Sequence, residues 1–306
     1  MAETSTIEWT DATWNPVTGC SVISPGCKHC YAMKLAGTRL KNHPSREGLT
    51  IDTAAGPVWT GEVRVNEPAM LDPIRWKRPR RIFVCAHGDL FHENVLDSTI
   101  DRVFAVMGAA PQHTFQVLTK RAERMRAYFA RVTADPAANW PLPNVWLGVS
   151  AEDQARANER VPQLLATPAA RRFVSAEPLL GPINLHDAMW AGDGDPLADL
   201  TATIDWIIVG GESGLGARPM HPDWARSLRD QCVAAGVPFF FKQWGAWAPL
   251  QKARPALHGA AGMVAWKDGR IGFNLDGGEP GQHMFIGTKG ITGRLLDGVQ
   301  HDGMPA

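Results

Sequence analysis

The chain has 306 residues, of which 44% are hydrophobic and 20% are charged, so it can bury a sizeable core and is not globally disordered. Its 31 basic and 31 acidic residues give a formal net charge of zero, which excludes a strongly basic coat for nucleic acid but not a local basic groove. No run of about 18 apolar residues predicts a membrane span, and residues 1–6 lack a signal-peptide pattern. We therefore expect a cytoplasmic protein without a membrane partner. The odd number of cysteines, five, argues against a disulfide framework.

Six short apolar runs have the composition of strands that are buried on both faces. They begin about 30 residues apart, which is the length of a strand plus a helix rather than of a hairpin. The runs are 82–86, 115–119, 145–149, 173–176, 204–209 and 237–241, and a further first strand is expected near 13–17. The segments between them predict helices. Ser98 and Asp101 indicate a capping box, while Pro222 and Gly236 indicate the start and the end of a later helix.

This alternation predicts an α/β fold, specifically a partial (β/α) TIM-like barrel of about six or seven parallel strands. We expect the barrel to span residues 1–249, with a cysteine-bearing loop near its N-terminus. Beyond Pro249 the sequence becomes rich in glycine and loses its period. Residues 250–306 are therefore expected to form an irregular C-terminal extension.

The most informative stretch holds Cys20, Cys27 and Cys30 in the spacing C-x6-C-x2-C. The glycines and the proline around them indicate a loop, on which three thiolates could converge on one metal centre. A structural zinc site wants four ligands, and an iron–sulfur cluster usually takes four cysteines, so that three would leave one iron open. Unligated thiols are the third alternative. The clustering favours an iron–sulfur cluster over zinc, and zinc over free thiols.

Three loop cysteines that end in C-x2-C and are followed by an aromatic residue, here Tyr31, resemble those of the radical S-adenosylmethionine enzymes. In that family three cysteines hold a [4Fe–4S] cluster, and the amino and carboxylate groups of S-adenosyl-L-methionine chelate the fourth iron. The usual spacing is C-x3-C-x2-C, from which the longer first gap departs. The resemblance implies that Cys20, Cys27 and Cys30 are the cluster ligands.

At closer range the chain up to about Trp247 resembles the phage Gp37/Gp68 family. That family name carries no established reaction, so the match identifies relatives rather than chemistry. The matching stretches are TWNPVTGC at 13–20, DLFH at 89–92, VLTKR at 117–121, VWLGVS at 145–150, SAEPL at 175–179 and GGESG at 210–214.

The chain is also similar, more distantly, to spore photoproduct lyase and its relatives. Those enzymes run from a cysteine loop to a strand end with Asp, then to one with Thr-Lys, then to one with Ser. The resemblance implies that Asp89, Lys120 and Ser150 contact S-adenosylmethionine. Tyr31 matches as well, whereas His29 replaces the usual tyrosine. Cys85 lies one residue away from the place of the lyase's hydrogen-donating cysteine, which departs from the pattern of photoproduct repair.

Polar residues also follow every predicted strand, and in parallel barrels the active site is built at this end. We take Glu177 and Glu212, with Tyr31, as candidate catalytic residues. Alternatively, Glu212 and Lys242 form a structural ion pair, or strand ends are polar simply because they meet water. Glycines at 210–216 are expected to let a bound cofactor approach the backbone. The polar residues are Asp89, Lys120, Ser150, Glu152, Glu177, Glu212, Ser213, Lys242 and Gln243. Beyond Asp89, the residues His92 and Glu93 are expected to be solvated or to cap the next helix, a metal-binding set with Asp89 being the alternative.

Basic residues lie beside Trp76 at 75–81 and again at 120–126, an arrangement that suits a nucleic-acid backbone and a stacked base, or equally a solvated surface. The sequence thus predicts a radical S-adenosylmethionine enzyme with a nucleic-acid base or nucleotide as the first candidate substrate. Its partners would be a flavodoxin-like or ferredoxin-like reductant and nucleic acid. The alternative is a non-catalytic, zinc-stabilised nucleic-acid-binding protein. Five tryptophans in loop-like contexts are candidates for the wall of an aromatic pocket, namely Trp9, Trp14, Trp59, Trp244 and Trp247.

Overall fold

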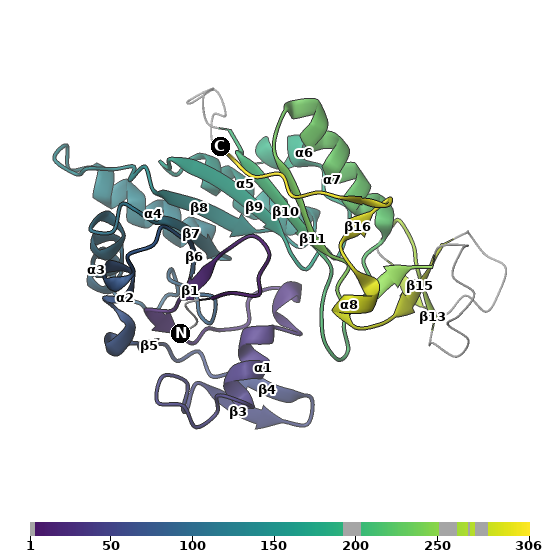
Figure 1. The fold of residues 1–306 in the computed structure, drawn as a ribbon, viewed down its shortest axis with the longest axis horizontal. Helices are drawn as coiled ribbons and strands as arrows, with labels where there is room; N and C mark the ends of the chain where they lie inside the picture. Colours follow the sequence, from purple (N-terminus) through teal and green to yellow (C-terminus); the bar gives the residue numbers. More distant parts are fainter. Residues whose placement is uncertain (1–3, 192–202, 251–261, 269, 273–280) are drawn as a thin grey trace. The chain divides into compact units, whose positions relative to one another are not determined.

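The computed structural model describes residues 4–191, 203–250, 262–268, 270–272 and 281–306. Its largest element is a seven-stranded sheet whose strands are adjacent in chain order (Figure 1). The strands are β1 (Ala12–Trp14), β6 (Arg81–Val84), β7 (Thr114–Thr119), β8 (Val145–Ser150), β9 (Arg171–Ala176), β10 (Trp206–Gly210) and β11 (Phe239–Gln243). The registered pairs in this sheet are parallel. Parallel strands in chain order are typical of a (β/α) barrel rather than of a doubly wound sheet, so the predicted fold class is confirmed.

The strands form where the sequence predicts them because their side chains are apolar on both faces. All five residues of β10 are buried, and so are Val145, Leu147 and Val149 of β8. A glycine in β8 serves close packing: a Cβ on Gly148 would lie 2.5 Å from the ring of Phe173. The core of the protein therefore lies along the sheet, and the polar strand ends are left for other roles.

The chain divides into two compact units. The first contains β1, β6, β7 and most of β8, and the helices that follow these strands. Its helical elements are η1 (Pro25–Cys27), α1 (Tyr31–Gly37), η2 (Glu67–Ala69), α2 (Asp72–Arg75), α3 (Asp97–Gly108) and α4 (Ala122–Thr133). Two antiparallel pairs complete it, β2 (Val17–Thr18) with β5 (Arg64–Val65) and β3 (Thr50–Thr53) with β4 (Gly56–Trp59). The hairpin of β3 and β4 lies beside α1 (Figure 1).

Helix α3 differs from the prediction at its start. The helix begins at Asp97, its N-cap is Leu96, and no side chain caps it, so the predicted capping box of Ser98 and Asp101 is wrong. Asp101 instead accepts hydrogen bonds from Tyr128 Oη at 2.7 Å and from Arg131 at 3.1 Å, both on α4. The carboxylate that looked like a local cap therefore joins two helices.

The second unit is built around β10, β11 and the helix between them, α7 (Pro222–Ala235), as shown in Figure 1. As predicted, α7 begins at Pro222, and Gly236 ends it with a left-handed φ of 67°. Trp224, Leu228 and Cys232 form its buried stripe. The remaining helices are α5 (Gln154–Leu165), which continues through Pro162, and α6 (Leu185–Met189).

The expected C-terminal extension lies partly outside the described residues, at 251–261, 269 and 273–280. The described remainder holds short antiparallel strands in place of the repeat. They are β12 (Trp247–Pro249), β13 (Gly262–Ala265), β14 (Ile271–Gly272) and β15 (Gln282–Ile286), then α8 (Lys289–Thr292) and a hairpin of β16 (Leu295–Leu296) and β17 (Val299–Gln300). The hairpin turn is Asp297-Gly298 with φ of 54° and 82°, as a type I′ turn requires. Asp297 then accepts from Arg226 and Arg229, which ties the hairpin to α7.

The five candidate pocket tryptophans are buried, and several residues of the basic runs contact other residues of the protein. Each of the five tryptophans expected at a pocket wall is at most 7% exposed, so they pack the interior. In the first basic run, Arg80 stacks on Trp76 and Arg81 pairs with Asp11. In the second, Arg124 pairs with Asp97. Among the helices that the structure describes, none is long and apolar enough to cross a membrane.

Candidate functional site

The cysteine loop, residues 20–30, is anchored at both ends to the turn that follows β6. At its start Gly19 has a φ of 92°, donates its N–H to His87 O at 3.2 Å and forms a bridge with Gly88. A Cβ at Gly19 would lie 2.2 Å from Glu62 O, so this approach requires glycine. At the other end, Tyr31 Oη donates to Ala86 O at 2.6 Å. The loop is therefore held against the C-terminal end of a central strand.

The three cysteines of this loop are free thiols. Cys27 is buried, while Cys20 and Cys30 are half-buried and pack against the small core around α1. Burial raises the pKa of Cys20 to about 12 and raises that of Cys30 as well, and the negative charge of Cys27 adds to both shifts. Cys27 thus interacts with both of the other two cysteines.

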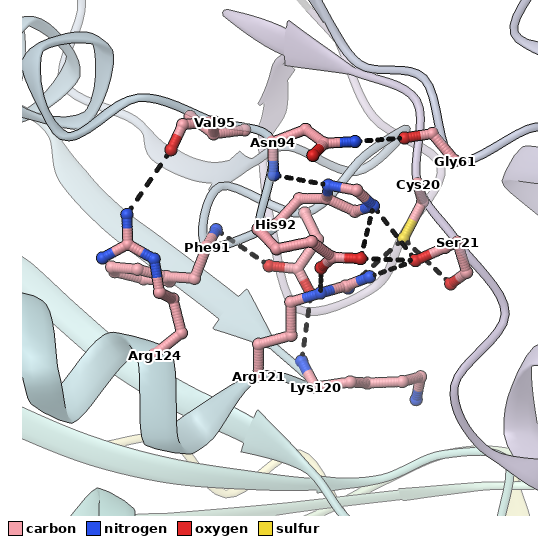
Figure 2. Close-up of polar contacts among 12 residues, drawn as sticks. Cys20, Ser21, Gly61, Phe91, His92, Asn94, Val95, Lys120, Arg121 and Arg124 are labelled. Carbon is pink, nitrogen blue, oxygen red and sulfur yellow. Dashed lines mark hydrogen bonds and ion pairs between the residues drawn. The ribbon is translucent and has the colours of Figure 1, made fainter.

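Two consecutive residues after β7, Lys120 and Arg121, bring positive charge to these cysteines. Arg121 Nη1 donates to Cys20 Sγ at 3.6 Å (Figure 2). The positive charge of Lys120 lowers the pKa of Cys30, against the larger effect of burial. Each of the two cations acts against burial, which is the larger effect and keeps the pKa of both thiols raised.

Asp89, predicted as a cofactor ligand, already receives four hydrogen bonds. Its Oδ1 accepts from Phe91 N at 3.0 Å and from Thr119 Oγ1 at 2.7 Å. Its Oδ2 accepts from Lys120 N at 3.2 Å and from Arg121 Nη1 at 3.1 Å. The carboxylate is 5% exposed. It thus joins the turn after β6 to the end of β7, and a contact with a cofactor stays a prediction.

His92 belongs to the same network (Figure 2), and Glu93 joins it through Arg121. The His92 side chain is fully buried, Nδ1 accepts from Asn94 N at 3.1 Å, and Nε2 therefore donates to Ser21 Oγ at 3.0 Å. Glu93 Oε2 accepts from Arg121 Nε at 2.8 Å. The expectation that both residues are solvated or cap the next helix is wrong for His92, which is buried, and confirmed for Glu93, whose side chain is 61% exposed. Neither residue caps α3, whose N-cap is Leu96.

The donor set differs from that of a site for one metal ion. Among the residues that the structure describes, no three His, Cys, Asp or Glu side chains are grouped so that they could hold a single ion. A closed zinc site draws four ligands to within about 2.0–2.3 Å of one atom. In a multi-iron cluster each cysteine binds a different iron, so three cysteines that do not converge on one ion can still serve such a cluster. Which metal centre these cysteines hold stays a prediction.

A buried basic pair lies beside Tyr31. Arg46 is 5% exposed, and its Nη2 donates to Nδ1 of His87 at 2.8 Å. Burial lowers the pKa of Arg46 to about 10 and that of His87 to about 4, so the histidine is neutral at physiological pH. The His87 ring meets the Tyr31 ring edge-on at 6.2 Å. This pair fixes the Tyr31 ring next to the cysteine loop.

The second unit holds Glu177, which follows β9. Lys242 Nζ lies 3.1 Å from Glu177 Oε1, and Ser175 Oγ donates to Oε2 at 3.2 Å. A Cβ on Gly210 would lie 2.3 Å from Glu177 Oε1, so the glycine makes room for this carboxylate. The alternative in which Lys242 pairs with Glu212 is therefore wrong, because Lys242 pairs with Glu177.

Glu212 is paired with Arg218 instead. Its Oε2 accepts from the backbone N and from Nε of Arg218, both at 2.8 Å. Gly211 and Gly245 let two backbone segments meet here, because a Cβ on either would lie about 2 Å from a carbonyl oxygen, that of Trp244 or of Glu212. Of the glycines at 210–216 that were expected to admit a cofactor, Gly211 thus admits the protein's own backbone.

Ser150 is the last residue of β8 and is 5% exposed. The registered pair Thr119–Val149 places the ends of β7 and β8 side by side, and Lys120 and Ser150 directly follow that pair. Their positions are therefore those that the sequence predicted. Gln243, at the end of β11, donates to Ser213 Oγ at 2.8 Å.

Arg121 is the residue that the sequence analysis missed. It was assigned to a basic surface patch, yet its side chain is 8% exposed and contacts the cysteine loop. The available signal was its position directly after a buried strand, where side chains converge with those that follow β6. Thr119 and Ser21 were missed for the same reason: their roles depend on Arg121 and Asp89.

Comparison with known families places the whole chain. Residues 4–305 match the model of a family described as "Protein of unknown function (DUF5131)", and the chain belongs to this family. No curated protein and no solved structure matches the chain significantly.

Proposed function

We propose that this member of the DUF5131 family is a radical S-adenosylmethionine enzyme in which Cys20, Cys27 and Cys30 hold a [4Fe–4S] cluster. The observation that carries the proposal is the set of three free cysteines on one loop with Arg121 and Lys120 acting on two of them. The resemblance of the loop to that family, and of the chain to the phage Gp37/Gp68 proteins and spore photoproduct lyase, supports it. The seven-stranded parallel sheet is compatible with the partial barrel of such enzymes.

The chemistry that this cofactor pair supplies when bound is reductive cleavage of S-adenosylmethionine to a 5′-deoxyadenosyl radical, which abstracts hydrogen from the substrate. The chain's own residues would bind and orient S-adenosylmethionine. Lys120, a compact cation beside Cys30, is suited to the cofactor carboxylate. Ser150 can bond a ribose hydroxyl. Asp89 is suited to the ammonium group, either directly or through the backbone that it fixes at the end of β7.

Candidates for the substrate side are Glu177, Glu212 and Tyr31. Glu177 is the better carboxylate, since its partner Lys242 is a flexible single-point cation, whereas Glu212 is locked by the guanidinium and the backbone of Arg218. A nucleic-acid base or nucleotide is the proposed substrate. A flavodoxin-like or ferredoxin-like protein would deliver the electron in the cytoplasm.

The decisive experiment is anaerobic purification and reconstitution, followed by assays of iron, acid-labile sulfide and 5′-deoxyadenosine. We expect about four irons and four sulfides per chain, and formation of 5′-deoxyadenosine when reductant and S-adenosylmethionine are added. Stoichiometric zinc without sulfide would overturn the proposal and favour the zinc-stabilised nucleic-acid-binding protein. A full cluster without 5′-deoxyadenosine would retain the metal centre but exclude the proposed reaction.

A further inference from the structure

Arg121 is an unusually buried cation with contacts to two different segments of the first unit. Its Nη2 donates to Ser21 Oγ at 2.6 Å, so together with the Cys20 contact it grips two successive residues of the cysteine loop. On its other side it binds Asp89 and Glu93, which follow β6. One guanidinium therefore couples the cysteine loop to the strand ends.

The geometry of Arg121 is fixed from its backbone outwards. It is the N-cap residue of α4, and its N–H donates to Thr119 Oγ1 at 2.9 Å. That hydroxyl donates in turn to Asp89, which also accepts from Arg121 Nη1. A closed ring of Thr119, Asp89 and Arg121 thus holds the guanidinium before any cofactor is bound.

The contact with sulfur is not explained by pairing of charges alone. Asp89 and Glu93 already supply two carboxylates for one guanidinium. A neutral thiol is a weak acceptor, so an N–H directed at Cys20 Sγ gains little while the thiol is protonated. The same N–H bonds strongly to an anionic sulfur, because charge-assisted hydrogen bonds are about twice as strong as neutral ones. The arrangement therefore suits a metal-bound thiolate.

We infer that Arg121 is a positioning residue that donates a charge-assisted hydrogen bond to the ligand sulfur of Cys20 and raises the reduction potential of the bound cluster. The inference rests on the proposed function. Reduction adds a negative charge to the cluster, and a hydrogen bond or a nearby cation stabilises that charge. The positive charge of Lys120 acts on Cys30, whereas Arg121 directs an N–H bond at Cys20.

The test compares the midpoint potential of the reconstituted protein with those of Arg121→Gln, Arg121→Lys and Arg124→Gln, after iron and sulfide have been measured in each. Arg124 is the matched control, because it lies on the same helix and pairs with an aspartate, Asp97, but contacts no cysteine. The Gln variant should be reduced about tenfold less readily, which is a shift of about 59 mV to more negative potential for a one-electron couple. The Lys variant should shift less, and the Arg124 variant should not shift.

The outcomes separate the two claims. A wild-type protein without iron and sulfide would overturn the proposed function and this inference with it. A fully loaded Arg121→Gln variant with an unchanged potential would overturn only the inference. Loss of the cluster from both Arg121 variants, with Arg124→Gln fully loaded, would also overturn the tuning role, since Arg121 would then serve assembly alone.

Discussion

The strand ends of the two units carry charged side chains of the same types, but they are satisfied differently. In the second unit each carboxylate has its own cation, Lys242 for Glu177 and Arg218 for Glu212. In the first unit one guanidinium is shared among Asp89, Glu93, Ser21 and the Cys20 sulfur. In the second unit, these pairs satisfy both carboxylates within the protein. In the first unit, one of the acceptors is the Cys20 sulfur, which accepts a strong hydrogen bond only when it is deprotonated. The comparison teaches that the cysteine side differs from the other strand ends in directing a shared cation at a sulfur atom.

The largest expected effect comes from removing the cysteines. Replacing Cys20, Cys27 or Cys30 by Ala should abolish binding of iron and sulfide, because each supplies one of three ligands. Cys232→Ala is the matched control, a buried thiol on α7, and it should keep the cluster at some cost in stability. Cys85→Ala should also keep it. Iron and sulfide assays on the five variants decide the matter, and a cluster that survives all three loop substitutions would contradict the proposed ligand set.

Asp89 and Glu212 allow the two kinds of strand end to be compared directly. Asp89→Asn breaks a buried pair with Arg121 and should lower the free energy of unfolding by about 3 kcal/mol. It should also lower the yield of bound iron, because Arg121 loses the partner that directs it toward Cys20.

Glu212→Gln is the control for Asp89→Asn. It should lower the stability by about 1–3 kcal/mol, because Arg218 keeps some exposure to water, and it should leave the iron content unchanged. Urea denaturation and iron assays give both quantities. Equal losses of iron in the two variants would remove the distinction between the units.

The two strand-end lysines sharpen the comparison further. Lys120→Ala should keep the cluster but weaken binding of S-adenosylmethionine by about 10- to 150-fold, since a lost charge-assisted hydrogen bond costs roughly 1.5–3 kcal/mol. Lys242→Ala, which leaves Glu177 without its cation, should not change that affinity. Titration followed by the electron paramagnetic resonance signal of the cluster measures both. If the affinity were unchanged in the Lys120 variant, the cofactor would have to be placed elsewhere.

The smallest effect is expected at the C-terminal hairpin, far in sequence from the cysteines. The side chain of Arg226 holds the pKa of Asp297 down at about 2, from an ordinary value of 3.8. Because the pKa is lowered in the folded state, the stabilisation is complete above pH 3.8 and is lost as the pH falls through about 2. The side chain is 38% exposed, so screening limits the gain to about 1 kcal/mol or less.

Asp297→Asn isolates this pair, because Asn tolerates the left-handed backbone at this position. Urea denaturation at several pH values should show a small difference between wild type and variant at pH 5 and a smaller one at pH 2, where the Asp297 carboxyl is about half protonated. An equal difference at pH 5 and pH 2 would show that the turn, rather than the ion pair, is responsible.

The fold was accessible from the sequence because its signals are local and repeated. Buried strands recur about every 30 residues, and α7 is marked by a proline at one end and a glycine at the other. Ser98 was misassigned because a capping box is a common short pattern that also occurs inside a first helical turn. The glycines at 210–211 were predicted to let a bound cofactor approach closely. They do allow a close approach, but the atoms that approach belong to the protein itself.

The site was accessible only in part. The cysteine loop stands out by composition, but the sequence does not say which of two adjacent basic residues turns inward. That choice depends on the backbone of Arg121, whose φ of −109° and ψ of 62° lead into α4. Similarly, Lys242 pairs with Glu177 rather than with Glu212. This pairing depends on Gly210, because a side chain at that position would collide with the Glu177 carboxylate. Such features follow from three-dimensional packing and have no local sequence signal.

The anchors of the cysteine loop also set an order of events during folding. Cys20 meets Arg121 across 101 positions of sequence, Ser21 meets His92 across 71, and Tyr31 meets Ala86 across 55. We expect contacts between residues so far apart in sequence to form late. Closing a long stretch of chain costs conformational entropy before the new contacts can stabilise the fold. The loop therefore takes its shape only after β6 and β7 have paired and presented their ends to it. Unlike a zinc finger, which folds around its metal, this protein would bind the proposed cluster only after its sheet has formed.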